Sequence, residues 1–262
     1  MIIIKYGIKE KFREWNDNDI YILTDFDRTI TTGNSNSSWG ILTAQNFDKN
    51  YEKERKDLYN FYRPLEVDSN INLEDKSKLM EEWWTKHINL FIKYKMNDDV
   101  IKNTILRDDV MSFRKNAKDF LIKMNEKHIP VIIISAGIGN VIKEFLKKEN
   151  CYFENIYIIS NYLNFENGIA AGIEGKIIHS FNKNEISLTK EIKDITKNRK
   201  NVIVLGDTIG DSFMYQGDND TIKIAFLEEN VEENLNNFKN YFDIVCTNNT
   251  SYKELFDALK ND

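Results

Sequence analysis

Residues 20–29 read Ile-Tyr-Ile-Leu-Thr-Asp-Phe-Asp-Arg-Thr, a short apolar run that leads into two aspartates. The β-branched and aromatic run predicts a buried strand over 20–23. Because strand side chains alternate in direction, Asp25 and Asp27 should point the same way from its carboxyl end. Two carboxylates this close repel each other, unless a hard cation such as Mg²⁺ lies between them and a phosphate group. An acidic turn after a core strand is the alternative that this motif alone leaves open.

Two further apolar runs end in small and polar residues. Residues 131–134 (Val-Ile-Ile-Ile) lead into Ser135-Ala136-Gly137, and residues 202–205 (Val-Ile-Val-Leu) lead into Gly206-Asp207 and then Asp211. Open α/β folds bind their ligands at the carboxyl ends of parallel strands, which meet at one edge of the sheet. The three strand ends are therefore expected to form one site.

Lys183 lies between those two runs in a segment without strong helical periodicity. With it, the strand ends offer a nucleophilic carboxylate, a second carboxylate for acid–base chemistry, a hydroxyl, a cation and a further metal-binding acid. That set has the parts of a phosphate and Mg²⁺ site. Taken singly, each part has a plainer interpretation: a turn of small residues at Ser135, a solvated surface lysine, or helix capping by Asp207 and Asp211.

The order of the apolar segments predicts the fold. Strands at 156–159, 222–227 and 243–246 continue the series, and helical segments with one apolar stripe separate them. Strands that alternate with helices indicate a parallel sheet with helices on both faces. The predicted fold class is α/β, a Rossmann-like parallel sheet core with an inserted helical cap.

The cap is the helical block between the first strand and the rest, which is too long for an ordinary loop. We place this helical cap at 33–107, and the catalytic core at 1–32 and 108–262. Within the cap, residues 78–94 carry apolar and aromatic side chains at spacings of three and four, as one face of a helix does. Pro64 is expected to interrupt the polar helical stretch before it.

The composition describes a globular chain and narrows its partners. Of 262 residues, 41% are hydrophobic and 30% charged, and the net charge is −6, so a basic surface for nucleic acid is not expected. No segment approaches the roughly 20 apolar residues of a membrane span, and the run Met1–Lys5 is too short for a signal peptide. Cys151 and Cys246 fit reduced thiols better than a disulfide. We expect a cytoplasmic protein, a monomer or a homodimer, that binds neither nucleic acid nor membranes.

In order and content these motifs resemble the haloacid dehalogenase superfamily of phosphatases, with residues 25–29 followed by Ser135, Lys183 and Gly206-Asp207-x-x-x-Asp211. Within that superfamily the chain resembles the cytosolic 5'-nucleotidase III (pyrimidine 5'-nucleotidase) family. The first cap segment, after residue 31, departs from the family's pattern, and this segment helps to choose the substrate. The narrower resemblance covers most of the chain from about residue 20 and rests on Ser135–Val141, Ile159–Phe165, Ile178–Lys183, Glu66–Asp68 and Glu82–Lys86.

The resemblance implies a role for each acidic motif residue. Asp25 would attack phosphorus and form an aspartyl-phosphate. Asp27 would protonate the leaving oxygen and then deprotonate the water that cleaves the intermediate. Mg²⁺ would be held by the Asp25 carboxylate, the Asp27 backbone carbonyl and Asp207.

The remaining motif residues would hold the phosphate or support the site. Ser135 and the amide of Ala136 would bind phosphate oxygens, and Lys183 would offset negative charge on the nucleophile and the phosphate. Asp211 would orient the metal's waters or the lysine. Thr29 would support the loop.

The cap would recognise the base. The resemblance points to Trp84 and Trp39 as rings that sandwich a nucleobase. Glu66 would accept a hydrogen bond from an exocyclic amine, and His87 would line the same pocket. The alternative is that both tryptophans fill the cap's own core.

The implied function is that of a Mg²⁺-dependent 5'-nucleotidase that hydrolyses nucleoside 5'-monophosphates, with CMP, UMP or 7-methyl-GMP as candidate substrates. Two alternatives stay open. One is a phosphatase for a small metabolite, such as a phosphoserine phosphatase, and the other is a non-catalytic nucleotide-binding protein on the same fold. The presence of both Asp25 and Asp27 argues against the latter, since loss of either is the simplest route to inactivity.

Overall fold

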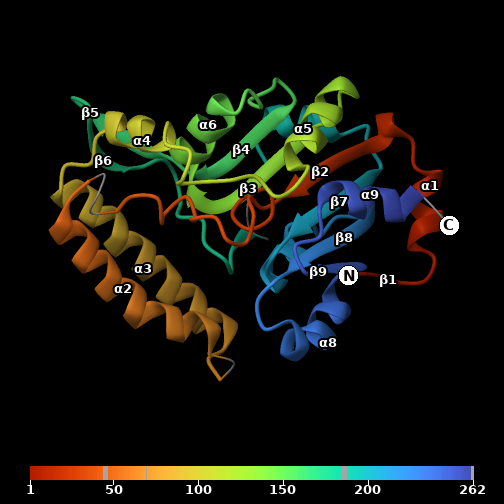
Figure 1. Ribbon diagram of the computed structural model, residues 1–262, viewed down its shortest axis with the longest axis horizontal. Helices are drawn as coiled ribbons and strands as arrows, with labels where there is room; N and C mark the ends of the chain where they lie inside the picture. The colour runs from red at the N-terminus through yellow and green to blue at the C-terminus, as the bar shows by residue number, and fades with distance from the viewer. Residues whose placement is uncertain (44–46, 69, 184–187, 261–262) are drawn as a thin grey trace.

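A seven-stranded sheet forms the centre of the computed structural model, which describes residues 1–43, 47–68, 70–183 and 188–260 (Figure 1). Its strand order is β1-β9-β8-β7-β2-β3-β4. Neighbouring strands are parallel except for β1, which pairs antiparallel with β9. The strands are β1 (Ile2–Ile4), β2 (Ile20–Thr24), β3 (Val131–Ile138), β4 (Ile156–Asn161), β7 (Asn201–Gly206), β8 (Asp220–Leu227) and β9 (Ile244–Thr247).

Strand β2 shows how the sheet is buried on both faces. All of its residues are buried, and their side chains alternate between two hydrophobic clusters, so that Ile22 joins one and Leu23 the other. A parallel strand that is buried on both faces has a continuous apolar sequence rather than an alternating one. The same pattern predicts strands at 131–134 and 202–205, and β3 and β7 confirm both.

Helices cover both faces, which confirms the predicted α/β class. One face packs against α1 (Ile8–Glu14), α5 (Ala117–Glu126), α6 (Gly139–Lys148) and α9 (Tyr252–Lys260). The other face packs against α7 (Lys190–Thr196) and α8 (Val231–Tyr241). Two short 3-10 helices, η1 (Asp17–Asp19) and η3 (Ile209–Phe213), lie before β2 and after β7.

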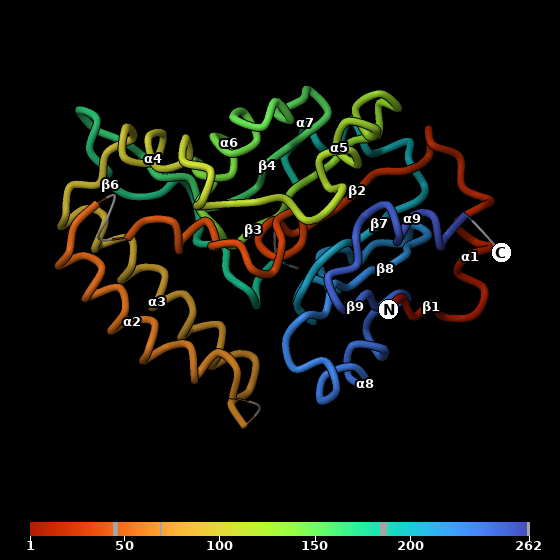
Figure 2. The backbone as a smooth tube through the Cα atoms, in the orientation of Figure 1, coloured from red at the N-terminus to blue at the C-terminus, as the bar shows by residue number. Residues whose placement is uncertain are grey.

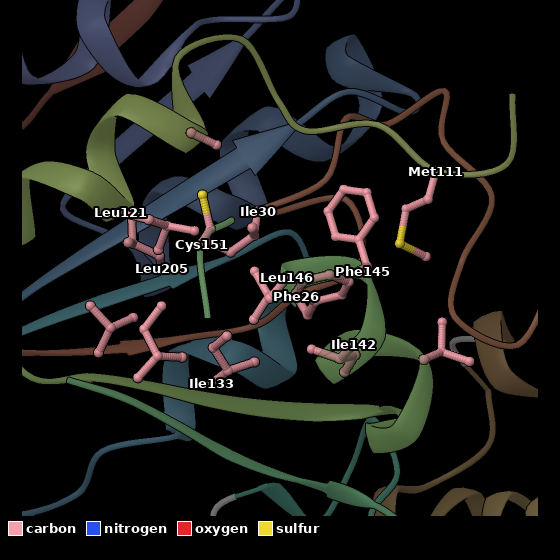
Figure 3. Packing of buried hydrophobic residues seen from close by; sticks show 14 of the residues in the cluster. Phe26, Ile30, Met111, Leu121, Ile133, Ile142, Phe145, Leu146, Cys151 and Leu205 are labelled. Atoms are coloured by element: carbon pink, nitrogen blue, oxygen red, sulfur yellow. The ribbon is translucent and has the colours of Figure 1, made fainter. Parts of the chain in front are cut away.

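Phe26, between the two aspartates at the edge of the sheet, packs into this core. The residue is fully buried, and its ring meets that of Phe145 edge to face with centroids 6.0 Å apart. Figure 3 shows the two rings beside Ile142 and Leu146 of α6. Burying such a ring contributes about 2–3 kcal/mol. Because Phe26 points into the core, the aspartates on either side of it point out of the core.

Two long consecutive helices, α2 (Lys49–Val67) and α3 (Leu73–Lys93), lie side by side at one end of the sheet, away from the chain termini (Figure 2). They pack through Tyr62, Met80 and Trp83. The next helix, α4 (Asp98–Ile105), packs against α6. All three helices fall within 33–107, and the limits of the cap stay a prediction.

Two details of the cap prediction are wrong. Helix α2 continues through Pro64 to Val67, and the Asp68 N–H donates to the Pro64 carbonyl at 3.1 Å. The packing of α2 against α3, through Tyr62 and Trp83, offsets the hydrogen bond that the proline loses. The cap is also not helical from its start. Helix α2 begins only at Lys49, where Asp48 accepts hydrogen bonds from two amides of the first turn.

Three strands are absent from the sequence prediction. Strand β1 forms an antiparallel edge. Strands β5 (Leu163–Glu166) and β6 (Ile169–Ile173) form an antiparallel hairpin that packs against α3. The hairpin extends the core toward the long helices.

Two further observations bear on the compositional expectations. Cys151 and Cys246 are buried free thiols. Within the described residues, no helix combines the length and the apolar character that a membrane crossing requires.

Candidate active site

The motif residues meet at one edge of the sheet. Asp25 follows β2, Ser135 lies near the end of β3, and Asp207 follows β7. Strand β2 lies between β3 and β7, so the carboxyl ends of adjacent parallel strands bring these side chains together. Lys183 reaches the same place from the loop between β6 and α7.

Lys183 joins two of the aspartates. Its Nζ donates to Oδ1 of Asp25 at 2.6 Å and to Oδ1 of Asp211 at 2.7 Å, and its side chain is only 5% exposed. Burial alone would lower the pKa of Lys183, but the two carboxylates outweigh burial and raise that pKa above its ordinary value. The lysine is therefore a fixed cation beside Asp25.

Asp25 lies in a crowded acidic environment. Burial raises the pKa of Asp25 to about 7; Lys183 offsets part of the rise, and Asp211 adds to it. Burial also raises the pKa of Asp207 well above its ordinary value, and the neighbouring carboxylates add to that rise. A further cation at this point would lower both pKa values and keep Asp25 ionised, which is the form that a carboxylate nucleophile needs.

The acidic cluster fits a divalent cation. Carboxylate oxygens of Asp25, Asp207 and Asp211 lie within 4.8 Å of one another. Oxygen ligands of this kind are those that Mg²⁺ prefers in proteins. Two buried carboxylates, Asp25 and Asp211, and the half-buried Asp207 beside one lysine also leave an excess of negative charge, which a metal ion would balance.

Asp211 has a structural task in this cluster. Its Oδ2 accepts hydrogen bonds from the Asp207 N–H at 3.1 Å and from both the N–H and the hydroxyl of Thr208 at 2.9 Å. Its Oδ1 accepts from Lys183. Asp211 therefore fixes the backbone that carries Asp207 and holds the Lys183 ammonium group in place.

Asp27 points into the same cavity as Asp25. Both of its carboxylate oxygens accept hydrogen bonds from Ser38, one from the N–H at 2.9 Å and one from the hydroxyl at 2.8 Å. Burial raises the pKa of Asp27, and these hydrogen bonds offset part of the rise.

Ser135 is held ready to donate. Its Oγ accepts the N–H of Gly137 at 3.0 Å, so its own proton is available for another acceptor. A Cβ atom at Gly137 would lie 2.1 Å from Oγ of Ser38 and 3.1 Å from Oδ2 of Asp27. Only glycine lets the chain pass this close to the aspartate.

The carbonyl oxygen of Ala136 accepts hydrogen bonds from residues of both the cap and the core. It accepts hydrogen bonds from the indole N–H of Trp39 at 2.9 Å, the indole N–H of Trp84 at 3.0 Å and the side-chain amide of Asn161 at 2.9 Å. Trp84 belongs to α3 and Asn161 to β4. The peptide between Ala136 and Gly137 is thus fixed from both sides.

A cavity of about 420 Å³ lies over these residues, within the range of about 300–1,000 Å³ that small-molecule sites occupy. Asp25, Asp27, Ser135 and Lys183 line it from the core. The cap lines the rest of it with cationic, acidic and aromatic side chains: Arg55, Tyr59, Arg63, Glu66, Trp83, Trp84 and His87.

Glu66 is engaged on both carboxylate oxygens. Arg63 Nη1 donates to Oε2 at 2.5 Å, and the Ser180 hydroxyl donates to Oε1 at 3.0 Å. Because Glu66 lies in α2 and Ser180 in the core loop that leads to Lys183, this carboxylate also joins cap to core.

The aromatic residues contact one another. The rings of Trp39 and Trp84 have centroids 5.5 Å apart and are inclined by 68°, so each presents an edge or a face to the other rather than a parallel slot. His87 packs against Trp39 with centroids 4.6 Å apart, and its Nε2 lies 2.8 Å from the Tyr51 hydroxyl. A flat base that enters here would have to stack on one ring or move the other aside.

Thr29 acts on the loop through its backbone. Its carbonyl accepts hydrogen bonds from Arg114 Nε at 3.0 Å and from the Tyr252 hydroxyl at 3.4 Å, while its own buried hydroxyl has no partner among the described residues. Arg114 also donates to the Arg28 carbonyl. The arginine therefore braces the turn that follows the two aspartates.

The residues that hold the motif residues in place are not indicated by any sequence motif. Arg114, Asn161 and Ser180 act from distant points in the chain, whereas Ser38 and Arg63 lie closer in sequence to the carboxylates that they contact. Ser38 alone has a possible sequence signal. It precedes Trp39, in the segment that departs from the family's pattern. The supporting residues are Ser38, Arg63, Arg114, Asn161 and Ser180.

Known proteins share both the sequence and the fold. A 7-methylguanosine phosphate-specific 5'-nucleotidase of Drosophila melanogaster is 35% identical over 236 residues, which cover 86% of this chain and 74% of that protein. The crystal structure of cytosolic 5'-nucleotidase IIIB bound to cytidine is similar with a TM-score of 0.89 and 30% identity, over 98% of this chain and 92% of that one. A substrate-bound phosphoserine phosphatase, at 19% identity and a TM-score of 0.60 over 92% of this chain and 97% of that one, shares the fold.

The parallel sheet with a helical layer on each face is the fold of the haloacid dehalogenase phosphatases, and the nucleotidase relatives show that the chain is a phosphoric monoester hydrolase. The family model described as pyrimidine 5'-nucleotidase (UMPH-1) matches residues 22–260. The chain belongs to that family.

Proposed function

We propose that this protein is a Mg²⁺-dependent 5'-nucleotidase that hydrolyses nucleoside 5'-monophosphates through an aspartyl-phosphate on Asp25. The observation that carries the proposal is the position of Asp25, 2.6 Å from the buried ammonium of Lys183 and on the wall of the cavity that Asp27 also lines. Nucleophile, cation and acid–base group then face one small-molecule site. A binding protein without chemistry would not need all of them.

In the first step an Asp25 carboxylate oxygen attacks phosphorus, and the bond from phosphorus to the 5'-oxygen breaks. Asp27 gives its proton to the departing oxygen. Ser135 and the amide of Ala136 hold phosphate oxygens, and Lys183 offsets the charge on the nucleophile and the phosphate. The products of this step are the nucleoside and a phosphorylated Asp25.

In the second step water attacks the phosphorus of the intermediate. Asp27, now ionised, takes the proton of that water, and Asp25 leaves as a carboxylate, so that both aspartates return to their starting forms. Asp25 and Asp207 would hold Mg²⁺, together with the backbone carbonyl of Asp27. When bound, the ion supplies positive charge between the carboxylates and the phosphate.

The nucleobase would bind on the cap side of the cavity. Trp84 or Trp39 would offer a stacking surface beside His87, and Glu66 would accept a hydrogen bond from an exocyclic amine. Support comes from their places on the cavity wall, from the relatives named for 7-methylguanosine phosphate, and from the related structure bound to cytidine. CMP, UMP and 7-methyl-GMP are therefore the first substrates to test. Relatives named as cytosolic nucleotidases support a cytoplasmic location.

The test is phosphate release with Mg²⁺ from CMP, UMP, AMP, GMP, 7-methyl-GMP and phosphoserine. Asp25→Asn removes the nucleophile, and Asp194→Asn makes the same change at an exposed aspartate of α7 as a matched control. Selective turnover of nucleotides, lost in Asp25→Asn and kept in Asp194→Asn, is the expected result. Turnover of phosphoserine alone would overturn the nucleotidase assignment and keep the catalytic one.

A further inference from the structure

Ser38 is a fully buried serine in the segment between β2 and α2. Its N–H donates to Oδ1 of Asp27 at 2.9 Å, and its hydroxyl donates to Oδ2 of Asp27 at 2.8 Å. One residue therefore binds both oxygens of the carboxyl group that lies beside the nucleophile. Two contacts from one fixed residue prevent that carboxyl group from rotating about its own bond.

The direction of the Ser38 hydroxyl is determined by a second neighbour. The N–H of Ile138 donates to Oγ of Ser38 at 3.1 Å. A hydroxyl has one proton and two lone pairs, so an oxygen that accepts from Ile138 keeps its proton for Oδ2 of Asp27. The hydroxyl is thus fixed as a donor toward the aspartate.

Ile138 is itself immobilised. It ends the segment that begins at Ser135, in which the hydroxyl of Ser160 donates to the Gly137 carbonyl at 2.7 Å. The Ala136 carbonyl accepts the three donors described above. Through Ser38, the carboxyl group of Asp27 is therefore held at a fixed position relative to Ser135 and Ala136.

We propose that Ser38 is a positioning residue for proton transfer. It holds the Asp27 carboxyl group at a fixed position relative to Ser135 and Ala136, the residues proposed to bind phosphate. The inference rests on the proposed function, in which Asp27 is the acid and the base. The two contacts fix the position and the plane of the Asp27 carboxyl group on the cavity wall. In the proposed reaction Asp27 gives its proton to the leaving oxygen as the P–O bond breaks, and it later takes a proton from the attacking water.

The leaving group provides the test. A ribose 5'-oxygen departs as an alkoxide and needs a proton from Asp27, whereas p-nitrophenolate is a stable anion and needs little assistance. The quantity to measure is kcat/KM, because it covers the steps up to departure of the alcohol and excludes hydrolysis of the shared intermediate. A variant that misplaces the acid lowers this ratio for the nucleotide more than for p-nitrophenyl phosphate.

Ser38→Ala removes the hydroxyl and keeps the backbone donor. We expect kcat/KM to fall about tenfold or more for the best nucleoside monophosphate, and less than about threefold for p-nitrophenyl phosphate, since general acid catalysis supplies about 10²–10⁴-fold. The matched control is Thr250→Val, which deletes another buried hydroxyl, one that donates to the Thr247 carbonyl at 2.6 Å. The control should leave both ratios unchanged.

A second comparison asks whether Ser38 acts through Asp27. In an Asp27→Asn background the acid is already absent, so Ser38→Ala should add almost nothing to the loss. Ser38→Cys keeps the size of the side chain with a weaker donor, and it should fall between serine and alanine even if the alanine variant folds poorly. Thermal unfolding of each variant reports on its fold.

Several outcomes would overturn the inference. Equal losses on both esters would mean that Ser38 is merely structural, and so would a full additional loss in the Asp27→Asn background. Unchanged kinetics in Ser38→Ala would remove any role. A wild-type enzyme that hydrolyses no nucleoside monophosphate would instead overturn the proposed function, a result that is distinct because it appears before any variant is made.

Discussion

The ammonium group of Lys183 balances the negative charge of two carboxylates at this site. It contacts Asp25 and Asp211 while almost wholly removed from water. Taking charged groups out of water is costly, and only close opposite charges and hydrogen bonds offset that cost. Loss of the one cation would leave two buried carboxylates facing each other.

Lys183→Met should therefore destabilise the protein and abolish turnover. Removing one partner of a buried ion pair costs about 3–5 kcal/mol, because the other charge stays buried without compensation. Urea unfolding in the presence of a chelator measures this loss. Lys78→Met is the matched control, since Lys78 forms an exposed pair with Glu74 in α3, and its removal should change stability little. Similar losses in both variants would contradict the assigned charge balance.

His87 predicts how stability depends on pH. Burial lowers the pKa of His87 from 6.5 to about 3, and Arg55 adds to the effect. Between these values the unfolded chain binds a proton that the folded protein does not. The stabilising contribution is fully present above about pH 6.5 and is lost as the pH falls toward 3.

His87→Gln should flatten that dependence. One pKa unit corresponds to about 1.4 kcal/mol, so the wild type should lose about 2 kcal/mol more than the variant between pH 7 and pH 5. Burial also lowers the pKa of His179, to about 4, but that residue is present in both proteins and cancels in the comparison. Denaturant unfolding at a series of pH values gives the difference, and parallel curves would show that His87 is not the buried neutral group.

At the scale of elements, the long helices reach the core through few polar contacts. Trp84 of α3 donates to the Ala136 carbonyl, and Glu66 of α2 accepts from Ser180. Ser77 of α3 also lies 3.3 Å from Nε2 of His179. Two of these contacts end on residues that line the cavity, Ala136 and Ser180. The position of the helix pair and the geometry of the cavity therefore depend on each other.

Trp84→Ala should raise KM for nucleotides more than KM for p-nitrophenyl phosphate. Stacking of a base on an aromatic ring contributes about 1–3 kcal/mol, which corresponds to roughly 5- to 150-fold. Trp84→Phe keeps a ring and loses only the indole N–H, so it isolates the hydrogen bond to Ala136. Ile92→Ala alters an exposed side chain of the same helix and should leave both constants unchanged. Equal effects of Trp84→Ala on both substrates would contradict the stacking role.

The elements also show which features a sequence can predict. Strands such as β7 are recognisable because burial on both faces requires a continuous apolar run. Strand β1 is not, because its three residues are a strand only by pairing with β9, more than 200 positions away. The β5–β6 hairpin is short and partly exposed, so its pattern is weak. The path through Pro64 depends on packing against α3, which no local rule contains.

The same distinction applies to the site. Asp25, Ser135 and Asp207 could be predicted because each lies at or just beyond the end of a recognisable apolar run, and parallel strands share an edge. Ser38 and Arg114 could not, because their roles exist only through contacts made across the fold, with Asp27 and with the carbonyl of Thr29. Motifs indicate the reacting groups, whereas the residues that position those groups are recognisable only in the tertiary structure.

At the scale of the whole molecule, a chain of net charge −6 gathers three carboxylates at one buried point of its central sheet. Burial and mutual repulsion raise the pKa of Asp207, which means that its ionised form destabilises the folded protein at neutral pH when no cation is present. Functional sites commonly reduce stability in this way. A bound divalent cation would turn this destabilising effect of the carboxylate into a stabilising one. The ion binds the folded protein and so stabilises it by mass action.

Asp207→Asn should therefore be more stable than the wild type in chelator and less stable than the wild type in Mg²⁺. In chelator the variant should melt above the wild type, since one buried carboxylate is gone. With Mg²⁺ at about 100 times its Kd, the wild type should gain about 2.7 kcal/mol, or roughly 5–10 °C for a chain of this size, and the variant much less. Asp194→Asn, at an exposed position of α7, should follow the wild type in both conditions. Thermal unfolding monitored by circular dichroism makes the comparison without any substrate. An equal Mg²⁺ response in Asp207→Asn and wild type would remove Asp207 from the metal site, because the ion would then be binding elsewhere.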